Sequence, residues 1–214
     1  MNNSLITLVV LIFTLNLTAC TNDNIMTWSG DNAFRTEKIK GIHGKAIWFN
    51  GTDAFVTGTA PVTIENEMTI AAWIKSDEWA GGDRGILGNI SFLSDRGFLL
   101  FYNGYANLLK FQVNINDNIE IVVAPPPLAG MWHLVAGTYN GSELCFYIDG
   151  RLRSKKEVSG KIINDNNAMV AGRFYNDLDD RYFQGALDEI MIFDRALSMN
   201  ELHKMYTNGG GDPD

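Results

Sequence analysis

The chain has little cysteine and little histidine, with two and three residues respectively among 214. A domain of this length buries about 70% of the surface that its unfolded chain exposes, so its core does not need disulfides. His43 and His203 lack the spacing of metal ligands, and His133 has no serine or cysteine beside it in the setting of a nucleophile. These shortages argue against a histidine metal centre and against a nucleophile–histidine pair.

Basic residues are also scarce, with 17 Lys and Arg against 25 Asp and Glu and a formal net charge of −8. Residues 1–19 contain none of these residue types, so the rest of the chain carries the whole imbalance. An acidic surface repels phosphate backbones, which argues against binding to nucleic acid. The same charge is compatible with divalent cations and with neutral sugars.

An apolar run extends from Leu5 to Phe13 and is interrupted only by Thr7. It is too short to span a bilayer but fits the apolar region of a signal peptide. Residues 17–20 resemble a bacterial lipobox, which implies cleavage before Cys20 and lipid on its thiol. We therefore expect residues 1–19 to be a lipoprotein signal peptide and Cys20 to be lipid-anchored in the cell envelope, at the outer membrane or the cell surface. No Lys or Arg precedes the run, and the alternatives are an uncleaved anchor or a plain secretory signal.

Cys145 then has no internal partner for a disulfide. It lies in the apolar run 144–148, which leads into the turn Asp149-Gly150 and a returning segment at 151–153. We predict a hairpin here, with Cys145 as a small buried hydrophobic residue and not a reactive thiol.

Short apolar runs and turn residues alternate along the chain from Lys45 onward. Asn50-Gly51, Asn140-Gly141 and Asp149-Gly150 are typical of tight hairpin turns, because these residues tolerate positive φ. Segments 68–75 and 132–137 show period-two alternation, and some strands carry apolar groups on both faces, as expected where two sheets pack together. The pattern predicts an all-β antiparallel sandwich of two sheets, with roughly a dozen strands.

The pattern also divides the chain. Residues 20–40 are polar and are predicted to form a tether, with a first short strand near its end. The domain is predicted over 41–208. Ser198 and Glu201 have the spacing of a capping box for a short C-terminal helix, and 209–214 is predicted to be a flexible tail. Residues 125–127 are all proline and therefore belong to a loop or an edge.

Three segments, in this order, resemble the laminin-G-like concanavalin A jelly roll, in its compact form related to pentraxins. They are Gly44–Gly51 with Asp53–Val56, Trp132–Tyr139 with Leu144–Gly150, and Phe183–Ser198. The resemblance covers residues 44–207 and implies a jelly roll of two curved antiparallel sheets, which agrees with the alternation above.

The resemblance also implies a structural Ca²⁺ held by Asn50 or Asp53 together with Asp188. Asp188 shares strand parity with Ile190 and Ile192, so it is expected to point inward, where a carboxylate needs a cation or several hydrogen-bond donors. Ca²⁺ accepts amide as well as carboxylate oxygens. The alternative is a carboxylate bonded to backbone N–H groups or to an arginine.

Sugar-binding sites commonly stack aromatic rings against the CH faces of the sugar. The predicted loops contain five candidates for such ligand contacts: Trp79, Tyr102, Tyr105, Phe174 and Tyr175. A loop tryptophan can also fold back as a lid over a sheet. The acidic stretch 176–180 follows the last of these residues, and we expect it to be a solvated loop.

Catalysis is not expected. Retaining glycosidases need two carboxylates about 5 Å apart, which a Glu-x-Asp-x-Glu strand can supply, and the chain has no such run. The adjacent residues Asp188 and Glu189 are expected to diverge, and Asp194 falls on the face opposite to Glu189. We therefore predict a non-catalytic, lipid-anchored domain that binds carbohydrate, with or without calcium. The alternatives are a protein-binding or adhesion module and, less favoured, a glycoside hydrolase.

Overall fold

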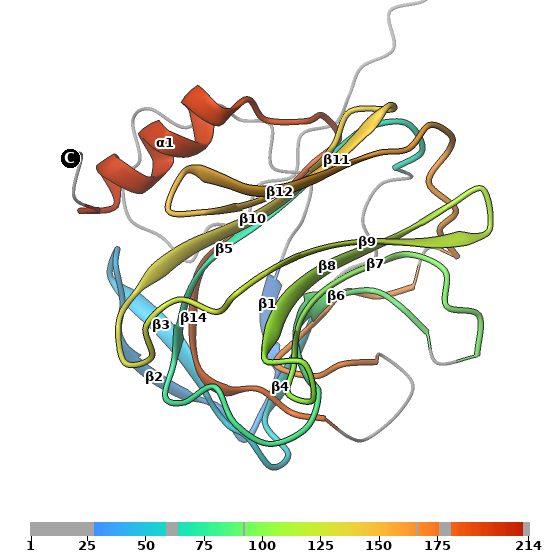
Figure 1. The fold of residues 1–214 in the computed structure, drawn as a ribbon. Coiled ribbons are helices and arrows are strands. Elements are labelled where there is room, and N and C mark those ends of the chain that lie inside the picture. Colours follow the sequence, from blue (N-terminus) through green and yellow to red (C-terminus); the bar gives the residue numbers. More distant parts are fainter. Residues whose placement is uncertain (1–27, 59–63, 92, 166, 176–180, 212–214) are drawn as a thin grey trace, which may run out of the picture.

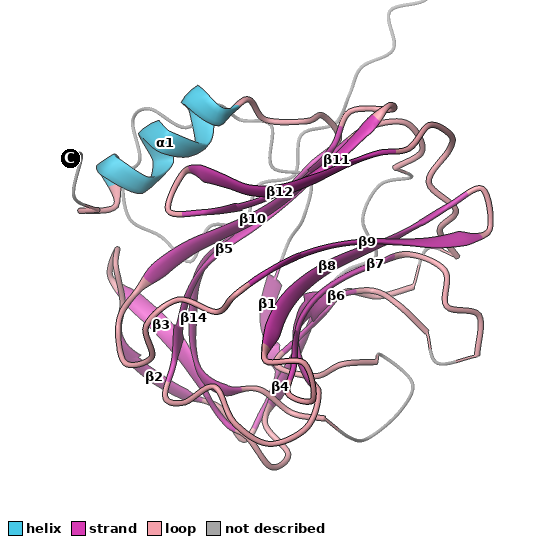
Figure 2. Ribbon diagram, in the orientation of Figure 1, coloured by secondary structure: helices cyan, strands magenta, loops and turns pink. Residues whose placement is uncertain are grey.

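The computed structural model describes residues 28–58, 64–91, 93–165, 167–175 and 181–211. Two antiparallel sheets of seven strands each pack face to face, and one short helix follows the last strand (Figures 1 and 2). The predicted all-β sandwich with a C-terminal helix is therefore confirmed. The predicted signal peptide, Cys20 and the acidic stretch 176–180 lie outside the described residues.

The sheet that carries no helix is called the front sheet. Its strands, in spatial order, are β1 (Trp28–Phe34), β4 (Phe55–Gly58), β13 (Val170–Ala171), β6 (Arg84–Gly88), β7 (Phe98–Asn103), β8 (Leu108–Ile115) and β9 (Asn118–Ala124). The other sheet is called the back sheet. Its strands, in spatial order, are β12 (Arg151–Glu157), β11 (Glu143–Ile148), β10 (His133–Tyr139), β5 (Met68–Ser76), β14 (Gln184–Phe193), β3 (Lys45–Asn50) and β2 (Glu37–Lys40).

The core lies between the two sheets and follows the predicted alternation. On β5, Met68, Ile70 and Ile74 are fully buried in the core between the sheets. The front sheet contributes the alternate residues of β7 and β8, such as Phe98 and Phe111. Because side chains alternate between the faces of a strand, the residues between these positions point to the outer faces.

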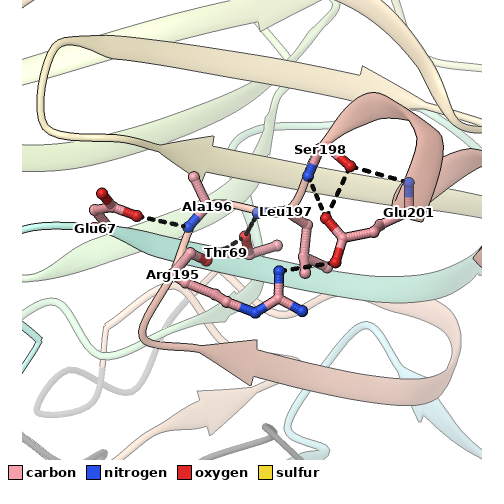
Figure 3. A network of polar contacts seen from close by, with 7 residues as sticks. All are labelled: Glu67, Thr69, Arg195, Ala196, Leu197, Ser198 and Glu201. Carbon is pink, nitrogen blue, oxygen red and sulfur yellow. Dashed lines mark hydrogen bonds and ion pairs between the residues drawn. The ribbon is translucent and has the colours of Figure 1, made fainter. Parts of the chain in front are cut away.

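Helix α1 (Met199–Asn208) lies on the outer face of the back sheet (Figure 1). The predicted capping box is confirmed, because the Ser198 hydroxyl accepts a hydrogen bond from the Glu201 N–H and the Glu201 side chain accepts one from the Ser198 N–H. Arg195 forms an ion pair with Glu201 at 2.8 Å. Thr69 on β5 bonds to the backbone of residues 195 and 197, which ties the start of the helix to the sheet (Figure 3).

Two strands fall within the segment that was predicted to be a tether. Strand β2 is the short strand predicted near the end of this segment, and it pairs with β3. Strand β1 was not predicted. β1 pairs with β4 at the edge of the front sheet, where backbone hydrogen bonds hold a strand that has few apolar residues. The domain therefore begins at least as early as Trp28.

A β-bulge interrupts β14 and changes the expected side of Asp188. Asp188 pairs with Trp73 and Met191 pairs with Ala71, so two residues of β14 face a single residue of β5. The extra residue reverses the alternation. Ile190 and Ile192 still reach the core, but Asp188 lies on the outer face beside Trp73, which stacks on Tyr206 of α1 with ring centroids 5.7 Å apart. The expectation that Asp188 points into the sandwich is wrong.

Candidate functional site

The three residues predicted to share a calcium ion do not form one site. Asn50 pairs with Gln184, four residues along β14 from Asp188. At about 3.3 Å per residue this places Asp188 about 13 Å away along the strand. The Asp188 carboxylate accepts hydrogen bonds from the backbone N–H groups of Ile42, His43 and Glu189, at 2.7 to 3.2 Å. The Asp188 carboxylate thus holds the turn between β2 and β3 against β14. This agrees with the alternative given above, in which the carboxylate is bonded to backbone N–H groups and not to a cation.

Asn50 and Asp53 are likewise occupied by protein groups. The Asn50 Oδ1 accepts three backbone N–H groups, from residues 52, 53 and 54. The hydrogen bond from the Asn50 amide and the ion pair with Arg35 lower the pKa of Asp53. These residues therefore do not fit a calcium ion, and the described part of the chain has no group of three or more His, Cys, Asp or Glu side chains that could hold a metal. Calcium binding by the protein stays a prediction, without these residues as its common site.

The bulge also contains Glu189, the carboxyl residue next to Asp188 in the sequence. Glu189 has a left-handed φ of 46° and is half-buried. Its burial, together with the negative charge of Asp188, raises its pKa to about 7. Asp188 is 5% exposed and accepts three backbone N–H groups, so its carboxylate is not presented to a substrate as the nucleophile of a glycosidase must be.

Cys145 is buried on the outer face of the back sheet, together with Tyr147 and Leu202 of α1. Burial is the main reason that the pKa of its thiol is raised, to about 11. The predicted role as a buried hydrophobic residue is confirmed, since a thiolate is scarce at neutral pH in such surroundings.

The outer face of the front sheet carries two groups of aromatic rings. The first contains Phe34 and Phe55, with centroids 5.5 Å apart, and Tyr182, 6.5 Å from Phe55. The second contains Phe101, Phe174 and Tyr175, with neighbouring centroids 4.8 and 4.6 Å apart. Aromatic pairs at these separations stabilise one another beyond the effect of burial alone.

Four cations lie over these rings and connect the two groups. Arg173, next to Phe174 in the sequence, lies over Phe55 at 4.2 Å from the ring centroid. Arg181, next to Tyr182, lies over Phe174 and Tyr175 at 5.2 and 5.7 Å. Each arginine thus reaches from one aromatic group to the other. The other two cations lie at the outer ends of the two aromatic groups. Arg35 lies over Phe34 and Lys110 over Phe101, at 5.1 and 5.8 Å from the ring centroids.

These rings and cations are called the cation–aromatic band. The band crosses the strands from β1 to β8, which are six neighbours in the sheet order and therefore span about 24 Å at 4.8 Å per strand. Phe34 is 46% exposed and Tyr175 is half-buried, so the band offers aromatic surface at both ends. The middle of the band is buried and supports the rings near its ends: Phe101, Phe174, Tyr182 and Arg173 are 5%, 7%, 7% and 9% exposed.

The other predicted aromatic residues lie at one end of the sandwich. The Trp79 indole is half-buried, packs 5.2 Å from the Tyr102 ring and donates its N–H to the Pro127 carbonyl at 2.7 Å. Tyr102 is 2% exposed and belongs to the core, so its prediction as a ligand contact is wrong. Tyr105, in contrast, is 89% exposed. The structure therefore places Trp79 and Tyr105 at this end of the sandwich, Phe174 and Tyr175 in the cation–aromatic band, and Tyr102 in the core.

Sequence reasoning missed most of the cation–aromatic band. The signal was present at Phe55, which alternates with buried Val56, and at Phe101, which alternates with buried Tyr102. Alternation assigns both rings to an outer face, but it does not indicate which strands are neighbours.

The concanavalin A-like lectin/glucanases superfamily matches residues 49–203, and the chain belongs to this family. The resemblance found in the sequence is thus confirmed. Among the curated protein sequences compared with this chain, none matches. No helix in the described residues is long and apolar enough to cross a membrane.

Solved structures with the same fold are distant in sequence. Domain 4 of AbnA, a GH43 extracellular arabinanase from Geobacillus stearothermophilus in complex with arabinotriose, is 17% identical with a TM-score of 0.65, covering 81% of this chain and 82% of that chain. The heptameric SAP-like pentraxin from Limulus polyphemus is 16% identical with a TM-score of 0.61, covering 81% and 86%.

The ligand binding domain of botulinum neurotoxin serotype D, in complex with N-acetylneuraminic acid, is 14% identical with a TM-score of 0.64, covering 84% and 47%. Other similar structures are the binding domains of Paraclostridial Mosquitocidal Protein 1 and of botulinum neurotoxin serotype G. This chain spans about half of their length, 48% of the former and 46% of the latter. Such distant similarities establish the fold alone.

Proposed function

We propose that the protein is a non-catalytic carbohydrate-binding module and that a sugar chain lies along the cation–aromatic band. The aromatic ring surface that Phe34 and Tyr175 expose near the two ends of the band is the observation that carries this proposal. Exposed ring surface at Phe34 and Tyr175 can pack against sugar CH groups. The Arg35 guanidinium and the Lys110 ammonium group, near the two ends of the band, can donate hydrogen bonds to hydroxyl or carboxylate oxygens.

Two of the similar structures support this choice of ligand class. The arabinanase domain is described in complex with arabinotriose and the serotype D toxin domain in complex with N-acetylneuraminic acid. Because those proteins are below 20% identical to this chain, the particular sugar is left to experiment.

A glycan array that includes neutral and acidic oligosaccharides tests the proposal, with calcium and with EDTA. We expect at least one class of glycan to bind, and Phe34→Ala and Tyr175→Ala each to weaken binding about tenfold, as loss of an aromatic contact does at other interfaces. Tyr105→Ser, at the separate end of the sandwich, is the matched control and is expected to bind as the unmodified protein does. The proposal would be overturned if no glycan binds, or if both band variants bind glycan as tightly as the unmodified protein does.

The same samples test the non-catalytic character. We expect bound oligosaccharides to be recovered intact, with no new reducing ends after long incubation. Release of reducing sugar by the unmodified protein would contradict this part of the proposal. If Glu189→Gln and both band variants still release sugar, the active site lies elsewhere.

We also propose that lipid on Cys20 anchors the domain to the cell envelope. The support is the sequence pattern that ends at Cys20. Cys20→Ala is expected to move the protein from the membrane fraction to the soluble fraction, whereas Cys145→Ala leaves it with the membrane. An unchanged distribution of the Cys20 variant would contradict the anchor.

A further inference from the structure

Three loops meet at one end of the sandwich and expose large apolar side chains. They are residues 77–83 between β5 and β6, residues 104–107 between β7 and β8, and residues 125–132 between β9 and β10. Tyr105, Leu128 and Met131 on these loops are 89%, 71% and 55% exposed. We call the surface that these loops form the apolar rim. Exposed apolar side chains that gather on one surface mark interaction sites on soluble proteins.

Contacts between the loops show that they form one surface. The Trp79 indole N–H bonds to the Pro127 carbonyl, and the Gly130 N–H bonds to the Ser76 carbonyl at the start of the first loop. Asn103, beside the second loop, donates to Asp83 of the first at 2.5 Å. The backbone of Gly104 packs so closely on Gly81 that a Cβ atom there would collide with the Gly81 carbonyl oxygen.

Hydrogen bonds from side chains of the strands also brace the loops of the apolar rim. The Tyr102 hydroxyl bonds to the Trp79 carbonyl and to Asn107, at 2.9 and 3.0 Å, and the Arg84 side chain bonds to the Ala80 carbonyl at 2.9 Å. Three consecutive prolines, at 125–127, stiffen the third loop. A preorganised surface loses little conformational freedom on binding, which favours affinity.

The charge of the rim indicates the chemistry of its partner. The first loop carries Asp77, Glu78 and Asp83, and the three loops contain no Lys or Arg. One cation, the guanidinium of Arg84 at the start of β6, lies against Ala80 and Gly81, so acidic groups outnumber it three to one. Carboxylates beside aromatic rings attract cations, both by direct pairing and through the negative faces of the rings. The aliphatic side chains Leu128 and Met131, by contrast, suit an apolar partner and offer no flat face for a sugar ring.

We propose that the apolar rim docks a segment of another protein in which basic and apolar side chains are interspersed. The apolar side chains of the segment pack against Tyr105, Leu128 and Met131, and its basic side chains lie against the first loop. This site is separate from the carbohydrate site on the outer face of the front sheet and does not depend on it.

Random peptides displayed on phage, panned against the purified protein, provide the test. We expect the enriched peptides to combine Lys or Arg with large apolar residues. After synthesis, these peptides are expected to bind more than tenfold more weakly to the double variant Tyr105→Ser/Leu128→Ser, since exposed anchor residues of this kind dominate peptide affinity. Their affinity is also expected to fall as salt is raised, because charge pairs at a surface are screened.

Phe34→Ala, in the cation–aromatic band, is the matched control and is expected to bind the peptides normally. Both substituted rim side chains are exposed, so unchanged thermal unfolding will confirm that the double variant is folded. Failure to enrich peptides, enrichment of acidic peptides, or equal binding by the double variant would each overturn the proposal. Glycan binding is measured with the same variants, so failure at one site is distinguishable from failure at the other.

Discussion

Replacement of Glu189 by Gln is expected to stabilise the protein at alkaline pH and to have little effect at acidic pH. Glu189 lies in the bulge of β14, half-buried and beside the buried carboxylate of Asp188. Burial and that neighbouring charge raise its pKa from 4.5 to about 7. The folded state therefore resists ionisation of Glu189, whereas the unfolded chain ionises it freely.

The sign and size of the effect follow from linkage. Below pH 4.5 the carboxyl group is protonated in both states, so no penalty arises. As pH rises through the folded value of about 7, the folded state comes to carry a charge that it disfavours, and stability is lost. At about 1.36 kcal/mol per pKa unit, a rise of about 2.5 units sets a ceiling of about 3.4 kcal/mol. Partial exposure of the side chain reduces the expected gain to about 1–2 kcal/mol.

Urea unfolding followed by tryptophan fluorescence measures this gain at pH 5 and at pH 8. The difference in unfolding free energy between Glu189→Gln and the unmodified protein is expected to grow by about 1–2 kcal/mol between these two pH values. Glu37→Gln, at an exposed position of edge strand β2, is the matched control and is expected to show no such growth. An equal effect of Glu189→Gln at both pH values would refute the reasoning.

Two further predictions concern the helix and the remaining cysteine. Ser198→Ala removes the capping hydrogen bond to Glu201 and is expected to cost about 1 kcal/mol of unfolding free energy in the same urea experiment, whereas unchanged stability would show that the cap is dispensable. In a Cys20→Ala background, Cys145 is expected to stay unlabelled by thiol reagents at pH 8 and to react only as the protein unfolds, because burial raises the pKa of its thiol to about 11; rapid labelling of the folded protein would contradict this.

Much of the architecture was predictable because the forces that specify it act over a few residues. Alternation along residues 68–75 reports which side chains of β5 face the core, and Asp149-Gly150 closes a hairpin through its own preference for positive φ. The Ser198–Glu201 cap joins residues only three positions apart. The family motifs add the order in which these elements follow one another.

The face of the back sheet on which the Asp188 side chain lies was decided by tertiary structure. Alternation places Asp188 with Ile190, and only pairing with β5 shows that an extra residue intervenes. Strand β1 was missed for a related reason, because an edge strand is held by backbone pairing with β4 and needs no apolar pattern of its own.

The two candidate binding surfaces were also decided by the tertiary structure. Phe34, Phe101 and Arg181 are far apart in the sequence and share one band because the sheet order places their strands side by side. The sequence by itself therefore determined the class of fold and the types of residue available for binding, since both depend on local pattern. Which of these residues meet on one surface was decided by long-range strand pairing, because hydrogen bonds between distant strands set the register that the local pattern leaves open.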